Sequence, residues 1–314
     1  MKKYYPEGTL FESPENQLII KNIDMLIEAA NTGKIVEAYA VICDNDHNLI
    51  VDLPCITGII PREEGAIGID DGTARDIAVV SRVSKPVSFK VIKIECDNAG
   101  EPVRAVLSRK AAQIECYENY VDTLKTGDII NARVTHNERF GSFVDIGCGI
   151  SSMIPVDFIS VSRIFHPSDR FSVSQNIRAV VRSIDNERKY PRITLSHKEL
   201  LGTWSENSSI FCAGETAAGI IRSVENYGIF VELMPNLAGL AEYKENIRAG
   251  QIASVYIKAI IPEKMKIKLI IAAVSDETAH LRDMKYFINS DHMDYWKYSP
   301  ECCQRLIETD FTHT

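Results

Sequence analysis

Alternation of apolar and polar residues recurs three times along the chain, and each time the alternating run opens with a glycine. The three runs begin at Gly33, Gly127 and Gly214. A period of two is typical of a half-buried β-strand. A turn rich in Asn, Asp or Gly follows each run and leads into a second apolar stretch, as expected of a hairpin. The pattern therefore predicts that the same hairpin is built three times.

Each repeat continues with a short apolar strand, a longer linking segment and two closing strands. The short strands are predicted at 58–61, 152–155 and 239–242, and the closing pairs at 87–94 with 104–108, 177–184 with 192–196, and 253–260 with 266–270. Five strands with the longest excursion after the third fit a five-stranded Greek-key barrel of the OB type. We therefore expect an all-β protein of three tandem OB-fold barrels with helical amino-terminal, linking and carboxy-terminal segments.

The expected domain boundaries follow from this pattern. We predict an N-terminal helical segment at 1–32, barrels at 33–113, 127–201 and 212–275, and a helical tail at 276–314. Ser13 followed by Pro14 is a helix-start signal, and the apolar spacing predicts one helix from there to Thr32. Residues 111–125 are expected to link the first two barrels as a helix. In the first barrel, 66–73 is expected to add an extra hairpin turn, followed by the apolar run 77–80.

Paired aromatic residues stand at the first hairpin turn of two repeats. Phe140 and Phe143 occupy this place in the second repeat, and Tyr227 and Phe230 repeat the spacing in the third. Rings on the binding face of an OB barrel can stack on bases, at about 1 to 3 kcal/mol per base. The alternative is that these rings fill the core, but strand alternation must turn one of two adjacent residues outward. The sequence therefore favours stacking in the second and third repeats.

The first repeat differs at these two positions, because it has His47 and Ile50 there. Without stacking rings, this barrel is a doubtful site for nucleic acid. We expect it to contact a protein or to pack against its neighbour.

Basic residues gather at turns and strand ends of the same two repeats. They are Arg139, Arg182, Arg188, Lys189 and Arg192 in the second repeat, and Lys258, Lys264, Lys266 and Lys268 in the third. Alternating lysines share one face of a strand. Contacts of these groups with phosphates would make affinity fall with salt, whereas the alternative is a solvated strand face.

The motif Phe-Gly-x-Phe-Val-x-Ile-Gly at 140–147, with Ile-Pro at 154–155 and Arg-Ile-x-Leu-Ser at 192–196, resembles a known RNA-binding repeat. It is the repeat of the S-one protein of the bacterial small ribosomal subunit, found also in polynucleotide phosphorylase. The resemblance extends over 33–274 and is strongest in the second repeat. Several repeats without an enzyme module resemble a short form of the ribosomal family. This implies single-stranded RNA, above all mRNA, as the partner, with association to the small ribosomal subunit in translation.

The RNA surface of that family uses two aromatic residues, a histidine on the third strand, and an aspartate and an arginine around the last turn. In the second repeat the resemblance assigns the last two roles to Asp185 and Arg192. The histidine position holds Pro155, and His166 is expected to substitute if its loop folds back. The alternative is that His166 is a solvated loop residue. In the third repeat, Lys266 stands at the arginine position.

The overall charge at first argues against nucleic acid, because 35 Lys and Arg face 43 Asp and Glu for a net charge of -8. The excess of acid is uneven. Residues 127–201 carry 10 basic against 8 acidic side chains, and 212–275 carry 7 against 6. The two repeats with aromatic pairs are therefore slightly positive, which permits RNA binding with modest affinity.

Other features narrow the class of protein. The amino terminus has no apolar run behind its lysines, no stretch approaches the roughly 20 apolar residues of a membrane helix, and eight cysteines are scattered without metal-site spacing. We expect a cytoplasmic protein without a cofactor or bound metal. Phosphate-loop and nucleophile-elbow motifs are absent, so an enzyme is not expected. The alternative function is a ribosome-associated or regulatory adaptor whose barrels mainly bind protein.

Overall fold

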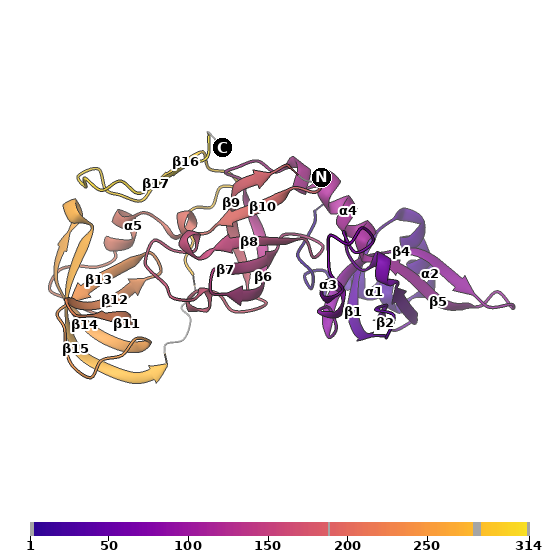
Figure 1. The fold of residues 1–314 in the computed structure, drawn as a ribbon, viewed down its shortest axis with the longest axis horizontal. Coiled ribbons are helices and arrows are strands. Elements are labelled where there is room, and N and C mark those ends of the chain that lie inside the picture. The colour runs from indigo at the N-terminus through magenta and orange to yellow at the C-terminus, as the bar shows by residue number, and fades with distance from the viewer. Residues whose placement is uncertain (1–2, 188, 279–283, 313–314) are drawn as a thin grey trace.

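The computed structural model describes residues 3–187, 189–278 and 284–312, and it shows three β-barrels in a row (Figure 1). Each barrel is closed and has five strands. The first barrel comprises β1 (Ile35–Cys43), β2 (Leu49–Leu53), β3 (Ile56–Ile60), β4 (Lys85–Cys96) and β5 (Pro102–Ser108).

The second and third barrels repeat this arrangement. The second comprises β6 (Ile129–Glu138), β7 (Gly141–Asp145), β8 (Ser151–Pro155), β9 (Asn176–Asp185) and β10 (Arg192–Ser196). The third comprises β11 (Thr216–Glu225), β12 (Gly228–Met234), β13 (Leu237–Ala241), β14 (Gln251–Ile261) and β15 (Lys266–Thr278). In all three the third and fifth strands pair in parallel, and the other pairs are antiparallel. The predicted all-β fold of three tandem five-stranded barrels is confirmed.

The N-terminal segment contains two helices where one was expected. Helix α1 (Pro14–Lys21) begins at the predicted Ser13 cap, and α2 (Ile23–Thr32) ends at Gly33, whose φ of 63° is left-handed. Asn22 separates them, because its extended backbone leaves the helical region and its side chain accepts hydrogen bonds from the first N–H groups of α2. Asn is a preferred N-cap residue, so it starts a second helix within an otherwise continuous apolar pattern.

The remaining helical elements are short and join the strands. They are η1 (Arg62–Glu64), α3 (Ile77–Val80), α4 (Arg109–Asn119), η2 (Val121–Thr123), η3 (Val156–Phe158), η4 (Pro167–Asp169), η5 (Lys198–Leu201), α5 (Trp204–Ser208) and η6 (Pro262–Lys264). Helix α4 is the expected link between the first two barrels. The 66–73 insertion forms turns without strands, and 77–80 is helical. No helix among the described residues is long and apolar enough to span a membrane.

The carboxy-terminal tail is not helical over the described residues 284–312, and this expectation was wrong. Instead β16 (Tyr295–Lys297) pairs with β17 (Glu308–Asp310) as a short antiparallel hairpin. Trp296 and Tyr298 are buried while Tyr295 is exposed, which is the period of two expected of a strand. Figure 1 shows the hairpin lying over the second and third barrels.

Buried polar contacts join the first two barrels through the N-terminal segment. The Glu7 carboxylate accepts hydrogen bonds from the Arg109 guanidinium, at 2.6 and 3.1 Å, and from the backbone N–H of Ser88. The backbone N–H of Glu7 donates to the Asp145 carboxylate of the second barrel at 2.7 Å. Arg109 also reaches the carbonyl of Gly149. A single segment thus holds the two barrels together.

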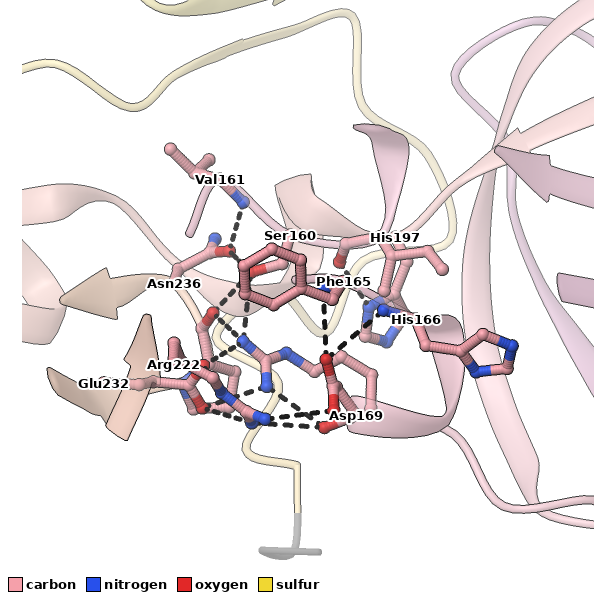
Figure 2. Close-up of polar contacts among 12 residues, drawn as sticks. Ser160, Val161, Phe165, His166, Asp169, His197, Arg222, Glu232 and Asn236 are labelled. Carbon is pink, nitrogen blue, oxygen red and sulfur yellow. Dashed lines mark hydrogen bonds and ion pairs between the residues drawn. The ribbon is translucent and has the colours of Figure 1, made fainter. Parts of the chain in front are cut away.

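A second buried cluster joins the second and third barrels (Figure 2). Arg170, just after η4, pairs with Glu232 of β12, and both side chains are 3% exposed. Arg222 of β11 bridges Glu232 and Asp169. The amide of Asn236 accepts from the backbone of Val161. Because breaking a buried ion pair leaves an uncompensated charge, these contacts fix how the two barrels sit together.

Candidate nucleic-acid interface

A row of partly exposed side chains crosses all five strands of the second barrel. Strand pairing places its members next to one another in the order His136, Phe143, Met153, Thr194 and Ser183. Phe143, Met153 and Thr194 each lie between buried residues of their own strand, such as Val144 beside Phe143. His136 and Ser183 are themselves exposed. The second-barrel row therefore faces outward, and its first three members offer two flat rings and a thioether.

The rings of this row have a defined geometry. The imidazole of His136 stacks on Phe143, with the centroids 4.3 Å apart and the planes within 8°. Phe140, in the adjoining turn, meets Phe143 edge to face at 5.9 Å and is 57% exposed. A phenylalanine this exposed does not fill the core, so its contact with Phe143 forms part of the surface. The two rings thus lie next to each other, with Phe140 on the surface.

No pattern in the sequence pointed to His136 as a surface residue. Val134 is buried on the same strand, so simple alternation would turn position 136 inward as well. A β-bulge between these two residues shifts the register and turns His136 outward. Burial of its ring lowers the pKa of His136, and the basic Arg82 and Lys85 of the first barrel add to this, against an opposing effect of Glu138. The lowered pKa favours the uncharged form of the stacked ring at neutral pH.

Polar groups flank the row. Asp185 and Arg192 are exposed and face each other across β9 and β10, two residues from the row on their strands. Arg192 forms no ion pair among the described residues, so its guanidinium is available to a ligand. Arg139 is exposed beside Phe140. Arg188, also expected in this group, lies outside the described residues.

The described side-chain hydrogen bonds of His166 lie within its own turn. It lies at the start of η4, where its Nδ1 accepts from the backbone N–H of Ser168 at 3.2 Å, and the Asp169 carboxylate accepts in turn from its own N–H. This reciprocal arrangement is a capping box. In Figure 2 the His166 ring points away from the ion-pair cluster. These contacts stabilise the turn that contains His166. A role of His166 in RNA binding stays a prediction.

The third barrel has an equivalent row at the same strand positions. Pairing places Ser223, Phe230, Leu240, Lys268 and Ala259 in order across it. Tyr227 meets Phe230 edge to face at 6.1 Å, with the planes at 86°, which repeats the Phe140–Phe143 geometry. The two barrels therefore present the same pair of rings on the same part of the fold.

Lysines replace the polar residues of the second barrel here. Lys268 stands in the row where the second barrel has Thr194, and Lys266 takes the place of Arg192 by pairing with Ile261. Both are exposed and alternate with buried residues of β15. Lys264, which the alternation placed on the same strand face, instead lies in η6. Two lysines, not three, thus line this side of the barrel.

The first barrel has a row at the same positions but with aliphatic side chains. Its members are Ile42, Ile50, Ile59, Val106 and Lys93. Ile42 is 58% exposed. His47 lies in the turn, near Asp76. This barrel offers no pair of stacking rings, in agreement with its sequence.

Two pairs of adjacent acidic residues, Glu63–Glu64 and Asp70–Asp71, could suggest a metal-dependent enzyme, but their contacts lie elsewhere. Asp70 pairs with Lys110, and Glu64 accepts from the Ser108 hydroxyl. Among the described residues, no group of three or more His, Cys, Asp or Glu side chains is arranged to hold a metal ion. The aromatic rings and the cations beside them on the second and third barrels are instead suited to binding bases and phosphates.

Comparison with known proteins agrees with this geometry. Residues 123–197, which contain the second barrel, match the S1 RNA binding domain. The chain is 29% identical to the small ribosomal subunit protein bS1 of Staphylococcus aureus strain COL over 203 residues, covering 60% of this chain and 50% of that protein. It is 26% identical to bS1 of Leuconostoc lactis over 246 residues, covering 73% of this chain and 54% of that protein.

The chain thus spans about half the length of the curated relatives it matches. Among solved structures, it is similar to a multidomain protein with nucleic acid binding domains from Streptococcus pneumoniae, with 14% identity, coverage of 79% and 76%, and a TM-score of 0.24. A score this low carries no argument about function. Residues 123–197, which match the S1 RNA binding domain, thus lie between two further barrels of the same strand order, in a chain that is similar to bacterial ribosomal protein bS1.

Proposed function

We propose that this protein binds single-stranded RNA on the outward rows of its second and third barrels. The observation that carries the proposal is the ring arrangement of the second barrel, where Phe140, Phe143 and His136 are held against one another on the surface. Bases stack on such rings without regard to sequence, and exposed cations beside them contact phosphates. Arg139, Asp185 and Arg192 are the polar groups assigned to this surface.

The third barrel contributes a second binding surface in this proposal. Tyr227 and Phe230 supply the rings, and Lys266 and Lys268 supply the charge. Because the two ring pairs have nearly the same geometry, one strand of RNA can be held by both barrels. Binding at two linked sites raises affinity beyond that of either site alone. The mode is binding, with no catalytic step.

The setting we propose is translation in the cytoplasm, with mRNA as the ligand and the small ribosomal subunit as a partner. It is supported by the relatives, which are named small ribosomal subunit proteins. The S1 RNA binding domain in the second barrel supports the RNA component directly. The ribosome component is testable by sedimentation of the protein with purified 30S subunits, with and without added RNA.

The test of RNA binding is the double substitution Phe140→Ala with Phe143→Ala in the full chain. Binding to an unstructured RNA of about 16 nucleotides, the upper range for one OB fold, is measured by fluorescence anisotropy. Loss of two stacking contacts is expected to weaken binding by about 2 kcal/mol or more. Tyr256→Ala is the matched control, because this exposed ring lies on β14 away from the row. Equal affinity of the double variant and the control would refute the proposed face.

A second candidate function is that of an adaptor, and the aliphatic row of the first barrel favours it. Ile42 and Ile50 offer apolar surface where the other barrels have rings. Pull-down from the source cells with and without ribonuclease separates the two functions. Partners lost on digestion support RNA binding, whereas partners that survive and depend on Ile42 support the adaptor.

A further inference from the structure

A pocket of about 340 Å³ opens beside the aromatic pair of the third barrel. This volume lies in the range of roughly 300 to 1,000 Å³ typical of small-ligand sites. Its lining comes from three parts of the chain. Tyr227 and Phe230 belong to the third barrel, Arg163 and Phe165 to a loop of the second barrel, and Arg305 to the tail.

The inner wall of the pocket is rigid. Trp204, Tyr298 and Asn236 line it and are buried. The Tyr298 hydroxyl donates to the backbone carbonyl of Asn236, and the Asn236 amide donates to the carbonyls of Lys198 and Gly202 while accepting from Val161. Because these polar groups already have hydrogen-bond partners within the protein, we assign this wall the role of shaping the pocket.

The rim of the pocket is aromatic. Tyr227 is 71% exposed, and its ring stands edge to face with the half-buried Phe230. A flat group that enters here can lie against a ring face, as a nucleobase does on other stacking surfaces. Glu225 also lines the pocket, and a carboxylate suits the exocyclic amino group of a base better than it suits a phosphate.

Two arginines stand at the outer edge. Arg163 and Arg305 are exposed, and neither forms an ion pair among the described residues. They also line an adjoining hollow, which shares Val161 with the pocket and adds Lys198. Arg222 lines the pocket too, but its guanidinium is occupied by Glu232 and Asp169. The Arg163 guanidinium lies over the Phe165 ring, 5.3 Å from its centroid. The two guanidinium groups thus lie between two hollows, where a phosphate linking two nucleotides would meet them.

We infer that this pocket takes one unpaired nucleotide of single-stranded RNA, with its base against Tyr227 and Phe230 and its phosphate on Arg163 and Arg305. The inference rests on the proposed function and adds to it a component outside the barrels. The tail forms part of the RNA site, because Arg305 comes from it. On the third barrel, residues of the tail and of a second-barrel loop line the pocket beside the aromatic pair.

The tail is fixed in this position by its own packing. Trp296, Tyr298 and Phe311 belong to the core cluster of the third barrel, and the backbone N–H of Trp204 donates to the Tyr298 carbonyl at 3.0 Å. Deleting the tail would therefore expose the core and damage the barrel. Single substitutions of exposed arginines avoid this difficulty and leave the packing intact.

The experiment compares Arg305→Ala and Arg163→Ala with Arg248→Ala in the full chain. Arg248 is an equally exposed arginine of the third barrel that does not line the pocket. Binding of the unstructured RNA of about 16 nucleotides is measured over a range of salt concentrations, and thermal unfolding confirms that each variant is folded. Each pocket variant is expected to weaken binding several-fold and to lower the salt slope by about 0.7, the value for one phosphate contact with a single strand.

The outcomes separate this inference from the proposed function. If both pocket variants bind with the affinity and salt slope of Arg248→Ala while Phe140→Ala with Phe143→Ala loses binding, the pocket is not an RNA site and the proposed function stands. If the unaltered protein does not bind the RNA, both are overturned. A selective loss in Arg305→Ala and Arg163→Ala supports the pocket as the nucleotide site.

Discussion

The first and second barrels have the same strand order and the same pairing, yet they present different surfaces. Where the second barrel has His136, Phe143 and Met153, the first has Ile42, Ile50 and Ile59 at matching positions. Even the β-bulge that turns the first of these outward is present in both. The fold therefore supplies an outward row, and the side chains placed on it decide what can bind.

The arginine and the acidic residue that face each other beside the row also differ between the first and second barrels. In the first barrel Arg104 faces Glu95 across β4 and β5, and the two form an ion pair at 2.6 Å. In the second barrel Arg192 faces Asp185 at the matching position, with no ion pair among the described residues. The first barrel satisfies its arginine internally, whereas the second leaves it available to a phosphate.

A third contrast lies after the last strand of each barrel, where a buried side chain follows a serine. Arg109 takes this place in the first barrel and binds Glu7, whereas His197 takes it in the second. Burial of the imidazole lowers the pKa of His197 to about 4. At this position the first barrel therefore has a buried ion pair, whereas the second has a neutral ring.

The largest expected effect comes from substituting the same row position in both barrels. Phe143→Ala is expected to weaken RNA binding by about 1 to 3 kcal/mol, because one stacking surface is lost. Ile50→Ala, the matched change in the first barrel, is expected to leave affinity unchanged. Titration of both variants with the same RNA checks this, and an equal loss in the two would show that the barrels do not differ as argued.

Acid is expected to destabilise the second barrel through His197. Its folded pKa of about 4 lies below the value near 6.5 of the unfolded chain, so its contribution to stability is present above pH 6.5 and is lost as pH falls toward 4. Between pH 7 and pH 5 this amounts to about 2 kcal/mol. Chemical denaturation at the two pH values measures it.

His197→Asn is the comparison for that measurement. The asparagine amide keeps a polar group near the Ile159 carbonyl, which the imidazole Nδ1 approaches at 3.2 Å, but it does not titrate. This variant is expected to be less stable at pH 7 and to lose less on acidification. An unchanged pH dependence would show that other groups govern the acid response.

A smaller effect is expected at the arginine position. Arg192→Ala is expected to weaken RNA binding by about 1 kcal/mol and to lower the salt slope by about 0.7, as for one phosphate contact. Arg104→Ala in the first barrel breaks an exposed ion pair and is expected to change neither quantity. A salt titration of the two variants distinguishes them, and equal slopes would remove Arg192 from the site.

The smallest effect concerns pH and RNA affinity. Because burial holds the pKa of His136 below its ordinary value, its ring stays neutral above pH 7. His136 is therefore expected to cause no change in RNA affinity between pH 7 and pH 8. Any change that also occurs in His136→Phe comes from other groups. A rise in affinity on acidification over this range that His136→Phe abolishes would indicate a charged imidazole in the site.

Much of this organisation could be predicted from the sequence, because it is encoded locally. Alternation and turn residues located the strands, and the Phe140–Phe143 spacing located the ring pair. His136 could not be found, since a bulge reverses the facing that alternation implies. The break at Asn22 and the tail hairpin were missed for a related reason. Capping and tertiary burial decided the structure of segments whose apolar residues also fit a helix.

The pocket of the third barrel also lay beyond prediction. Tyr227 and Phe230 were recognised, but Arg163 and Arg305 come from segments far away in the sequence. Buried contacts between the second and third barrels, among them those of Arg170 and Asn236, and the packing of the tail bring them together. Sequence patterns of one repeat contain no information about such a junction.

The most direct test of the central claim is to map which residues of the chain contact RNA. Ultraviolet crosslinking to an unstructured RNA, followed by mass spectrometry of the crosslinked peptides, identifies the contacted residues. The account predicts crosslinks at Phe140 or Phe143 and at Tyr227 or Phe230, with none in the strands that carry Ile42 and Ile50. Crosslinks concentrated on the first barrel, or absent from the second, would contradict it.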